Sequence, residues 1–377
     1  MGATTSALAA TDKVTCDWLT QALREGGVLS TGAVLACDER NNGAFNSTIV
    51  HLTLTYSDDA PYDAPRRLLL KRNLDIDWAV ESARDEAAFY QTVMQIDPQP
   101  PSIVPCYLAI FDAQRRASSL LLADVSASHR EPLTRDDLLC GDSIPDETAL
   151  HQAIDALADV HAYWWGRPEL DSVFPLSNWT GDEARFTAHV ERRQREWQQF
   201  LAAEDTEFPD DLRPIYDHAL ARLPGLWHAG LGARMSTPRR LTLAHGDCYL
   251  TQFLVPREGV TAPTYLVDFQ SATVDMPSFD LSLMLAAFCS REQRQHDDHE
   301  LRSLRRYHDQ LLAAGVRDYT WDDLLAEYQL ALSILLFYPV WDETNGSPRT
   351  YWLPKMRCLA AAYEDHCMIG PLSHRPG

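Results

Sequence analysis

The 377-residue chain has no Cys-x-x-Cys spacing, although it contains eight cysteines. That absence excludes zinc ribbons and dithiol redox sites, and nothing in the spacing of the thiols indicates disulfides. The first 13 residues lack a basic segment followed by an apolar core, so no secretory signal is expected. They match the short Met-Gly-x-x-x-Ser pattern of N-myristoylation, which often occurs by chance. We therefore expect an unmodified cytoplasmic protein with reduced thiols.

The chain also lacks an excess of basic residues. Its 33 lysines and arginines are outnumbered by 54 acidic residues, which gives a formal net charge of −21. Nucleic acids and anionic membranes bind basic patches, so neither is an expected partner. The charge permits a cationic substrate, although solubility explains it equally well. The longest apolar run near the C-terminus, residues 330–341, is too short to span a bilayer and predicts a buried helix.

Hydrophobic periodicity predicts strands and one long helix in the first 125 residues. Apolar residues alternate from 50 to 56, which is typical of a half-buried strand, and a second hairpin strand follows around "RLLLK". Residues 77–94 change to steps of three and four, the period of an amphipathic helix. Two further strands are predicted around a turn at residues 112–116. A leading helix is expected to end at Gly26 and Gly27.

Helical patterns dominate the rest of the chain, apart from a strand-rich island at residues 241–269. The pattern predicts an α+β protein with two lobes. The N-terminal lobe, residues 1–125, is β-rich and contains one long helix. The C-terminal lobe, residues 126–377, is larger and mainly helical.

Polar residues suited to phosphoryl transfer lie on this island. An apolar run stops at "HGD", which ends at Asp247, and Gln252 follows five residues later. The last strand of the island ends at Asp268. Upstream, Lys71 lies on a predicted strand and Glu86 follows on the long helix. Each residue alone is typical of a turn or a solvated surface, so the prediction depends on their order and spacing.

This order of motifs resembles the aminoglycoside phosphotransferase and choline kinase superfamily, and within it the ecdysteroid-kinase-like branch. The resemblance covers "LLLADV" as a hinge, "HGDCYLTQ" as a catalytic loop and "LVDFQ" as a metal-binding strand end. It implies a protein-kinase-like bilobal fold. It also implies an ATP- and Mg²⁺-dependent kinase that phosphorylates a hydroxyl of a small molecule.

Chemistry explains the same residue types independently of the resemblance. Phosphoryl transfer requires positioning and charge neutralisation. Asp247 is suited to accept the proton of the acceptor hydroxyl, and Asp268 and Gln252 offer the hard oxygen ligands that Mg²⁺ prefers. Lys71 supplies a cation for the α- and β-phosphates, and Glu86 holds it by an ion pair. The resemblance assigns the same roles.

The nucleotide site is predicted on backbone groups. The segment "NNGAFNST" has one glycine, Gly43, where a Gly-x-Gly repeat is usual in protein kinases. Backbone N–H groups from Gly43 through Asn46 to Ser47 are expected to cap the phosphates. The adenine is expected to bind the hinge backbone between Ala123 and Val125.

Three further polar residues are expected to be structural. His245 is predicted to brace the loop rather than act as a base. Asp280 is expected to anchor the backbone of the loop by hydrogen bonds, although contact with substrate is an alternative. His161 is predicted to be a core histidine with its hydrogen bonds satisfied.

One residue departs from the family pattern. Gln252 stands where the superfamily has asparagine, and the extra methylene moves the amide oxygen by roughly 1.5 Å. Mg²⁺ demands near-ideal octahedral geometry, which the longer side chain would disturb. The sequence therefore has an alternative interpretation: a pseudokinase-like protein that binds nucleotide or a ligand without turnover. The acceptor is open as well. The acidic charge suits a cationic aminoglycoside, and ten tryptophans suggest aromatic walls for a bulky apolar or steroid-like compound.

Overall fold

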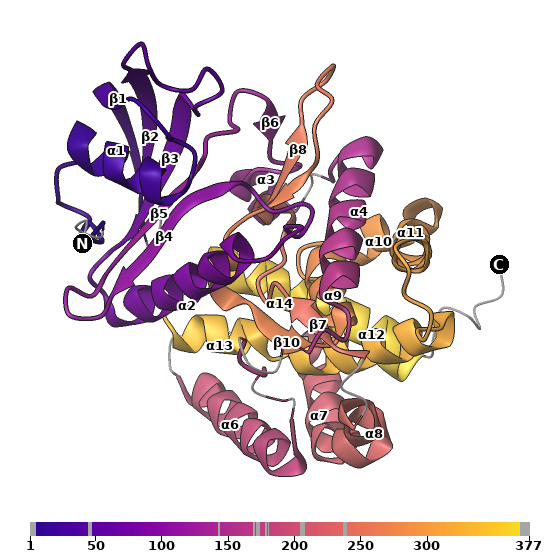
Figure 1. Ribbon diagram of the computed structural model, residues 1–377. Helices are drawn as coiled ribbons and strands as arrows, with labels where there is room; N and C mark the ends of the chain where they lie inside the picture. Colours follow the sequence, from indigo (N-terminus) through magenta and orange to yellow (C-terminus); the bar gives the residue numbers. More distant parts are fainter. Residues whose placement is uncertain are drawn as a thin grey trace. The chain divides into compact units, whose positions relative to one another are not determined.

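The computed structural model describes residues 5–43, 47–141, 144–168, 170, 174–177, 179, 181–203, 208–236 and 240–369. The chain forms two compact units (Figure 1). The first comprises Met1–Arg130 and Pro256–Ala272, and the second Glu131–Val255 and Thr273–Gly377. This division differs from a single boundary after residue 125, because the segment that contains Asp268 belongs to the first unit.

The first unit is built on a five-stranded antiparallel sheet in the order β1-β2-β3-β5-β4. The strands are β1 (Val34–Gly43), β2 (Ser47–Tyr56), β3 (Arg67–Asn73), β4 (Cys106–Asp112) and β5 (Ala117–Ala123). Side chains alternate between the two faces of a strand. Leu68 and Leu70 are fully buried in the core on one face, so Lys71 projects from the opposite face, across from Ile49. The sequence pattern predicted strands β2, β3, β4 and β5, but it did not identify β1 as a strand of its own.

Two helices flank this sheet, and both were predicted. Helix α1 (Cys16–Glu25) is capped by Thr15, ends at Gly26, and buries Leu19 and Leu23 in the core with the leucines of β2 and β3. Helix α2 (Asp77–Met94) has the predicted bounds and lies along β4 and β5 (Figure 1). Short elements complete the unit: β6 (His129–Arg130), β9 (Tyr265–Leu266) and the 3₁₀ turn η6 (Phe269–Ser271).

The second unit is mainly helical, as predicted, and α4 lies beside α11 within it (Figure 1). Its helices are α3 (Arg135–Cys140), α4 (Glu147–Trp164), α6 (Glu183–Ala202), α7 (Arg213–Arg222), α8 (Gly232–Met235), α9 (Pro277–Ala286), α10 (Arg291–Gln295), α11 (His299–Ala313), α12 (Trp321–Leu335), α13 (Tyr338–Thr344) and α14 (Arg349–Tyr363). Every residue of α9 is buried, so this helix forms the centre of the unit.

A small two-stranded sheet positions the predicted catalytic loop. Strand β7 (Thr242–Ala244) pairs antiparallel with β10 (Thr273–Asp275), and the loop begins where β7 ends. After the loop come the 3₁₀ turn η5 (Leu250–Gln252) and β8 (Phe253–Pro256).

The apolar C-terminal segment is a buried helical stretch. Residues Trp321–Thr344 are long and apolar enough to cross a membrane by length and composition, but 72% of an 18-residue window within this stretch is buried inside the protein. This burial is typical of a core helix, which agrees with the prediction for residues 330–341.

Candidate active site

Three of the predicted site residues meet in the first unit. The Lys71 ammonium donates to the Glu86 carboxylate, with the shortest Nζ–Oε2 distance at 2.8 Å, and to Oδ1 of Asp268 at 2.5 Å. Lys71 comes from β3, Glu86 from α2, and Asp268 from the residue that precedes η6. The fold therefore brings one cation and two carboxylates together from three separate parts of the chain.

Aromatic packing fixes Asp268 against α2. The ring of Phe269 stacks on Phe89, with 3.9 Å between centroids and 9° between planes, and meets Tyr90 edge-on. Asp268 itself has a φ of 68°, in the left-handed region that aspartate tolerates better than most residues. Just before it, the Leu266 N–H donates to the Ser102 carbonyl at 2.8 Å. The carboxylate of Asp268 is thus held by backbone and ring contacts on both sides.

The two carboxylates keep Lys71 charged. Burial alone lowers the pKa of Lys71, since apolar surroundings favour the neutral amine. The negative charges of Asp268 and Glu86 outweigh burial, so the pKa of Lys71 lies above its ordinary value. The lysine is a permanent cation at physiological pH, which is the form that a polyphosphate would need.

The predicted phosphate loop is partly described. Gly43 ends β1 and Ser47 begins β2, whereas Asn46 lies outside the described residues. Ser47 pairs with Asn73, two positions along β3 from Lys71, so both side chains share one face of the sheet. The Ser47 hydroxyl is buried and has no hydrogen-bond partner in the described part of the chain. A buried hydroxyl without a partner on the face of Lys71 fits an anionic ligand such as a phosphate.

The predicted hinge is an ordered backbone segment. The Ala123 N–H donates to the Pro105 carbonyl at 2.9 Å. The Ala123 backbone can therefore hydrogen-bond the adenine of a nucleotide through its carbonyl but not through its N–H. The Val125 carbonyl accepts from the N–H groups of Ser128 and His129.

In the second unit, Asp280 on α9 holds the predicted catalytic loop. Its carboxylate accepts from the N–H groups of His245 at 2.5 Å and Gly246 at 2.9 Å. It also meets His161 Nε2 at 3.1 Å, while His161 Nδ1 is 2.5 Å from the Tyr307 hydroxyl. All of these groups except Gly246 are buried. The predicted roles of Asp280 as a loop anchor and of His161 as a satisfied core histidine are confirmed.

The loop presents Asp247 on a braced backbone. The Asp247 N–H donates to His245 Nδ1 at 3.3 Å, and its carbonyl accepts from the Tyr249 N–H at 2.9 Å. His245 is buried and braces the loop, as predicted. Gly246 has a φ of 80°, which a residue with a side chain would adopt only under strain. Gln252 is half-buried in η5, and its N–H donates to the Tyr249 carbonyl.

Replacing Asp280 with asparagine is expected to lower the free energy of unfolding by about 2 to 4 kcal/mol. In the wild type, the N–H groups of His245 and Gly246 both donate to the Asp280 carboxylate. The asparagine amide would turn its NH₂ group toward these donors, and the buried negative charge that faces His161 would be lost. Urea unfolding with an unchanged m-value measures the loss. Ser282→Ala is the control, because that hydroxyl on the same helix donates to the Ser278 carbonyl within the helix. Equal losses in both variants would contradict the anchoring role.

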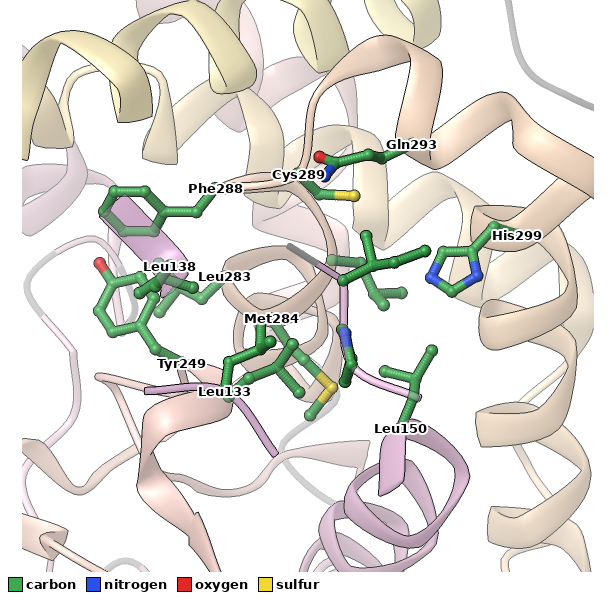
Figure 2. Close-up of a pocket in the computed structure, with 14 residues that line it drawn as sticks. Leu133, Leu138, Leu150, Tyr249, Leu283, Met284, Phe288, Cys289, Gln293 and His299 are labelled. Atoms are coloured by element: carbon green, nitrogen blue, oxygen red, sulfur yellow. The ribbon is translucent and has the colours of Figure 1, made fainter. Parts of the chain in front are cut away.

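Among the described residues, the aromatic side chains that line the pocket beside the loop are Tyr249 and Phe288, not tryptophans. Tyr249, two residues after Asp247, lines a small apolar pocket with Leu283, Met284 and Phe288 (Figure 2). The pocket measures about 30 Å³, whereas small-molecule sites usually enclose about 300 to 1,000 Å³. It is therefore a packing gap beside the loop rather than a substrate cavity.

Sequence reasoning missed a buried ion pair in this unit. The Lys355 ammonium on α14 donates to Asp342 on α13 at 2.9 Å, and both side chains are almost fully buried. Neither residue belongs to a motif, and their separation of 13 positions gives no periodic signal.

The chain resembles known proteins in sequence and in fold. The model of the Ecdysteroid kinase-like family matches residues 185–319, about a third of the chain, which include Asp247, Gln252 and Asp268. No curated protein sequence matches. Among solved structures, a choline kinase from Cryptosporidium parvum Iowa II is 12% identical with a TM-score of 0.53, over 87% of this chain and 89% of its own.

The chain has a protein-kinase-like fold. A Plasmodium vivax ethanolamine kinase has a TM-score of 0.55 at 9% identity and covers 87% of this chain and 82% of its own. The GDP complex of an aminoglycoside 2′-phosphotransferase-IIIa has a TM-score of 0.51 at 13% identity, over 87% of this chain and 93% of its own. The predicted resemblance to the kinase-like superfamily and its ecdysteroid-kinase-like branch is confirmed, and so is the α+β fold class.

Proposed function

We propose that the protein is an ATP- and Mg²⁺-dependent O-phosphotransferase that moves the γ-phosphoryl group to a hydroxyl of a small molecule. The observation that carries the proposal is the ion-paired trio of Lys71, Glu86 and Asp268. A cation held between two carboxylates suits a ligand made of phosphates and a divalent metal, because the cation meets the phosphates and one carboxylate meets the metal. The buried Ser47 hydroxyl, which has no hydrogen-bond partner among the described residues, supports an anionic ligand on the same face of the sheet.

The donor set fits magnesium. Among the described residues, no group of three or more His, Cys, Asp or Glu side chains could hold a metal. Mg²⁺ needs no such group, since it usually takes one or two carboxylates together with phosphate and water oxygens. Asp268 would supply the carboxylate and Gln252 an amide oxygen. When bound, the metal neutralises charge on the phosphates.

Asp247 is proposed as the catalytic base. The acceptor oxygen attacks the γ-phosphorus, the bond to the β–γ bridging oxygen breaks, ADP leaves, and the hydroxyl proton passes to Asp247. The transfer is direct and needs no phosphoenzyme. Asp280 serves this step by fixing the loop backbone through the N–H groups of His245 and Gly246.

The comparisons support a nucleotide donor and a small acceptor. The aminoglycoside 2′-phosphotransferase named above is a GDP complex, and the other two neighbours are choline and ethanolamine kinases. In this chain we propose ATP, with the adenine near the backbone of Ala123 and Val125 and the phosphates near Gly43, Asn46 and Ser47. All eight cysteines, each within the described residues, are free thiols, in keeping with a cytoplasmic location.

A pseudokinase-like binding protein is the second candidate. Gln252 favours it, because a longer amide in the metal set weakens octahedral coordination. Such a protein would bind nucleotide or another ligand but would not transfer phosphate.

Thermal unfolding with ATP, with and without Mg²⁺, tests the proposed function. At ~100 times its dissociation constant, ATP is expected to stabilise the protein by about 2.7 kcal/mol. The shift should depend on Mg²⁺ and shrink when EDTA is added. Consumption of ATP with a panel of hydroxyl compounds then tests transfer. A folded protein without any shift would contradict the nucleotide site, and a shift without turnover would favour the binding protein.

A further inference from the structure

An ammonium group is built into the second unit beside the catalytic loop. Lys355 is 1% exposed, and its Nζ lies 2.9 Å from Oδ2 of Asp342, which is 5% exposed. A lysine is rarely buried so completely unless it is paired. Burial lowers the pKa of Lys355, but Asp342 outweighs this effect, so the pKa lies above its ordinary value. The buried side chain is therefore a cation.

Three tyrosine rings surround this cation. Lys355 Nζ lies 5.2 Å from the ring centroid of Tyr249, 5.4 Å from Tyr351 and 5.6 Å from Tyr338. We call these three rings and the Asp342 carboxylate the tyrosine box. A set of aromatic faces with one carboxylate is the arrangement by which proteins bind ammonium ligands. Here the ammonium belongs to the chain itself.

The tyrosine box lies next to the proposed base. Tyr249 is two residues after Asp247, and its N–H donates to the Asp247 carbonyl. The charge of Asp247 acts electrostatically on Lys355 and on each of the three rings. Tyr338 and Tyr351 are only partly buried, so these two residues reach the protein surface, whereas Lys355 itself is buried. Because Tyr249 follows Asp247 by two positions, we expect an acceptor whose hydroxyl reaches Asp247 to have its neighbouring groups close to these rings.

We propose that Lys355 determines acceptor specificity: its ammonium fills the tyrosine box, so the protein takes uncharged hydroxyl compounds and rejects alcohols that carry an ammonium group. The proposal rests on the proposed function, because it describes the acceptor of that reaction. A second cation would be repelled by Lys355 and would find its aromatic partners already occupied. The net charge of −21 therefore does not make a cationic acceptor favourable.

Choline and its uncharged isostere 3,3-dimethyl-1-butanol provide matched probes. Binding is measured without nucleotide, by calorimetry and by thermal unfolding, on wild type, Lys355→Ala and Lys355→Gln. Wild type should not bind choline. Both variants empty the box of its cation and keep Asp342, so choline should bind at least about tenfold more tightly than to wild type. The affinity of the two variants for 3,3-dimethyl-1-butanol should not rise by the same factor.

Two further variants make the result decisive. Lys355→Arg keeps a cation in the box and should still reject choline. Lys355→Gln combined with Asp342→Asn removes the carboxylate and should lose most of the gain. Should Lys355→Ala fail to fold, Lys355→Gln carries the test, because its amide can still donate to Asp342. Choline binding to wild type, or no gain in Lys355→Gln, would overturn the proposal.

The two proposals fail separately. If the variants bind choline more tightly but no alcohol is phosphorylated, the proposed role of Lys355 is supported and the proposed kinase function is contradicted. If uncharged alcohols are phosphorylated but the variants bind choline no more tightly than wild type, the kinase function is supported and the proposed role of Lys355 is contradicted. When both hold, wild type should phosphorylate uncharged alcohols in preference to choline, and Lys355→Gln should narrow that preference by at least about tenfold.

Discussion

Asp247→Asn is expected to lower kcat by about a hundredfold to ten-thousandfold, the usual contribution of a positioned general base. The amide has the shape of the carboxylate but cannot accept the proton that leaves the acceptor hydroxyl. The loop backbone should persist, because Asp280 accepts from the N–H groups of His245 and Gly246, and His245 accepts from the Asp247 N–H. Steady-state transfer to an uncharged alcohol measures the loss.

The binding of ATP provides the internal control for this variant. Asp247 lies in the second unit, whereas Lys71 and Asp268 form their ion pair in the first. The thermal shift with Mg²⁺ and ATP should therefore match that of wild type. Glu258→Gln removes an exposed acidic charge 11 positions further along the chain and should leave kcat unchanged. A rate for Asp247→Asn within threefold of wild type would show that another group takes the proton.

The sequence carried enough information for the longer elements and for the site in the first unit. Alternation over β2 and the three- and four-residue steps over α2 are local signals, because a long amphipathic element repeats its pattern several times. Helix α2 carries Glu86, and β2 pairs with β3, where Lys71 lies across from Ile49. The ion pair between Lys71 and Glu86 follows from the pattern once strand and helix pack together.

The bounds of short elements and distant contacts were beyond sequence reasoning. Strands β7 and β9 lie in the predicted strand-rich island, but with two or three residues each they are too short for their bounds to be predicted, and the three-residue strand β10 was not predicted. Their positions are set by tertiary contacts, such as those that bring Leu266 to Ser102. Lys355 and Asp342 resemble surface charges in the sequence, and only the packing of α13 against α14 buries them together. The tryptophans suggested aromatic walls, with core burial as the alternative for most of them. Trp164 and Trp352 are core residues, whereas Trp341 is 47% exposed.

Asp268→Asn is expected to abolish the Mg²⁺-dependent part of the ATP thermal shift and to lower kcat by at least about a hundredfold, since charge stabilisation by a metal is worth several kcal/mol. The neutral amide is a weaker ligand for Mg²⁺ than a carboxylate. The fold should persist, because Lys71 keeps its ion pair with Glu86 at 2.8 Å. The measurement is the ATP shift with and without Mg²⁺, together with kcat, compared with wild type.

Gln252→Asn is the matched variant, because it restores the amide length of the superfamily at the second proposed ligand. A metal ligand at this position should tolerate the change, so kcat should stay within about threefold of wild type or rise, as coordination becomes closer to octahedral. A large loss would mean that η5 is built around the longer side chain. The two variants together separate the candidate functions. Loss in Asp268→Asn with activity kept in Gln252→Asn indicates a working metal site. A protein without turnover that gains it in Gln252→Asn would owe its inactivity to the longer amide, which is the pseudokinase-like alternative.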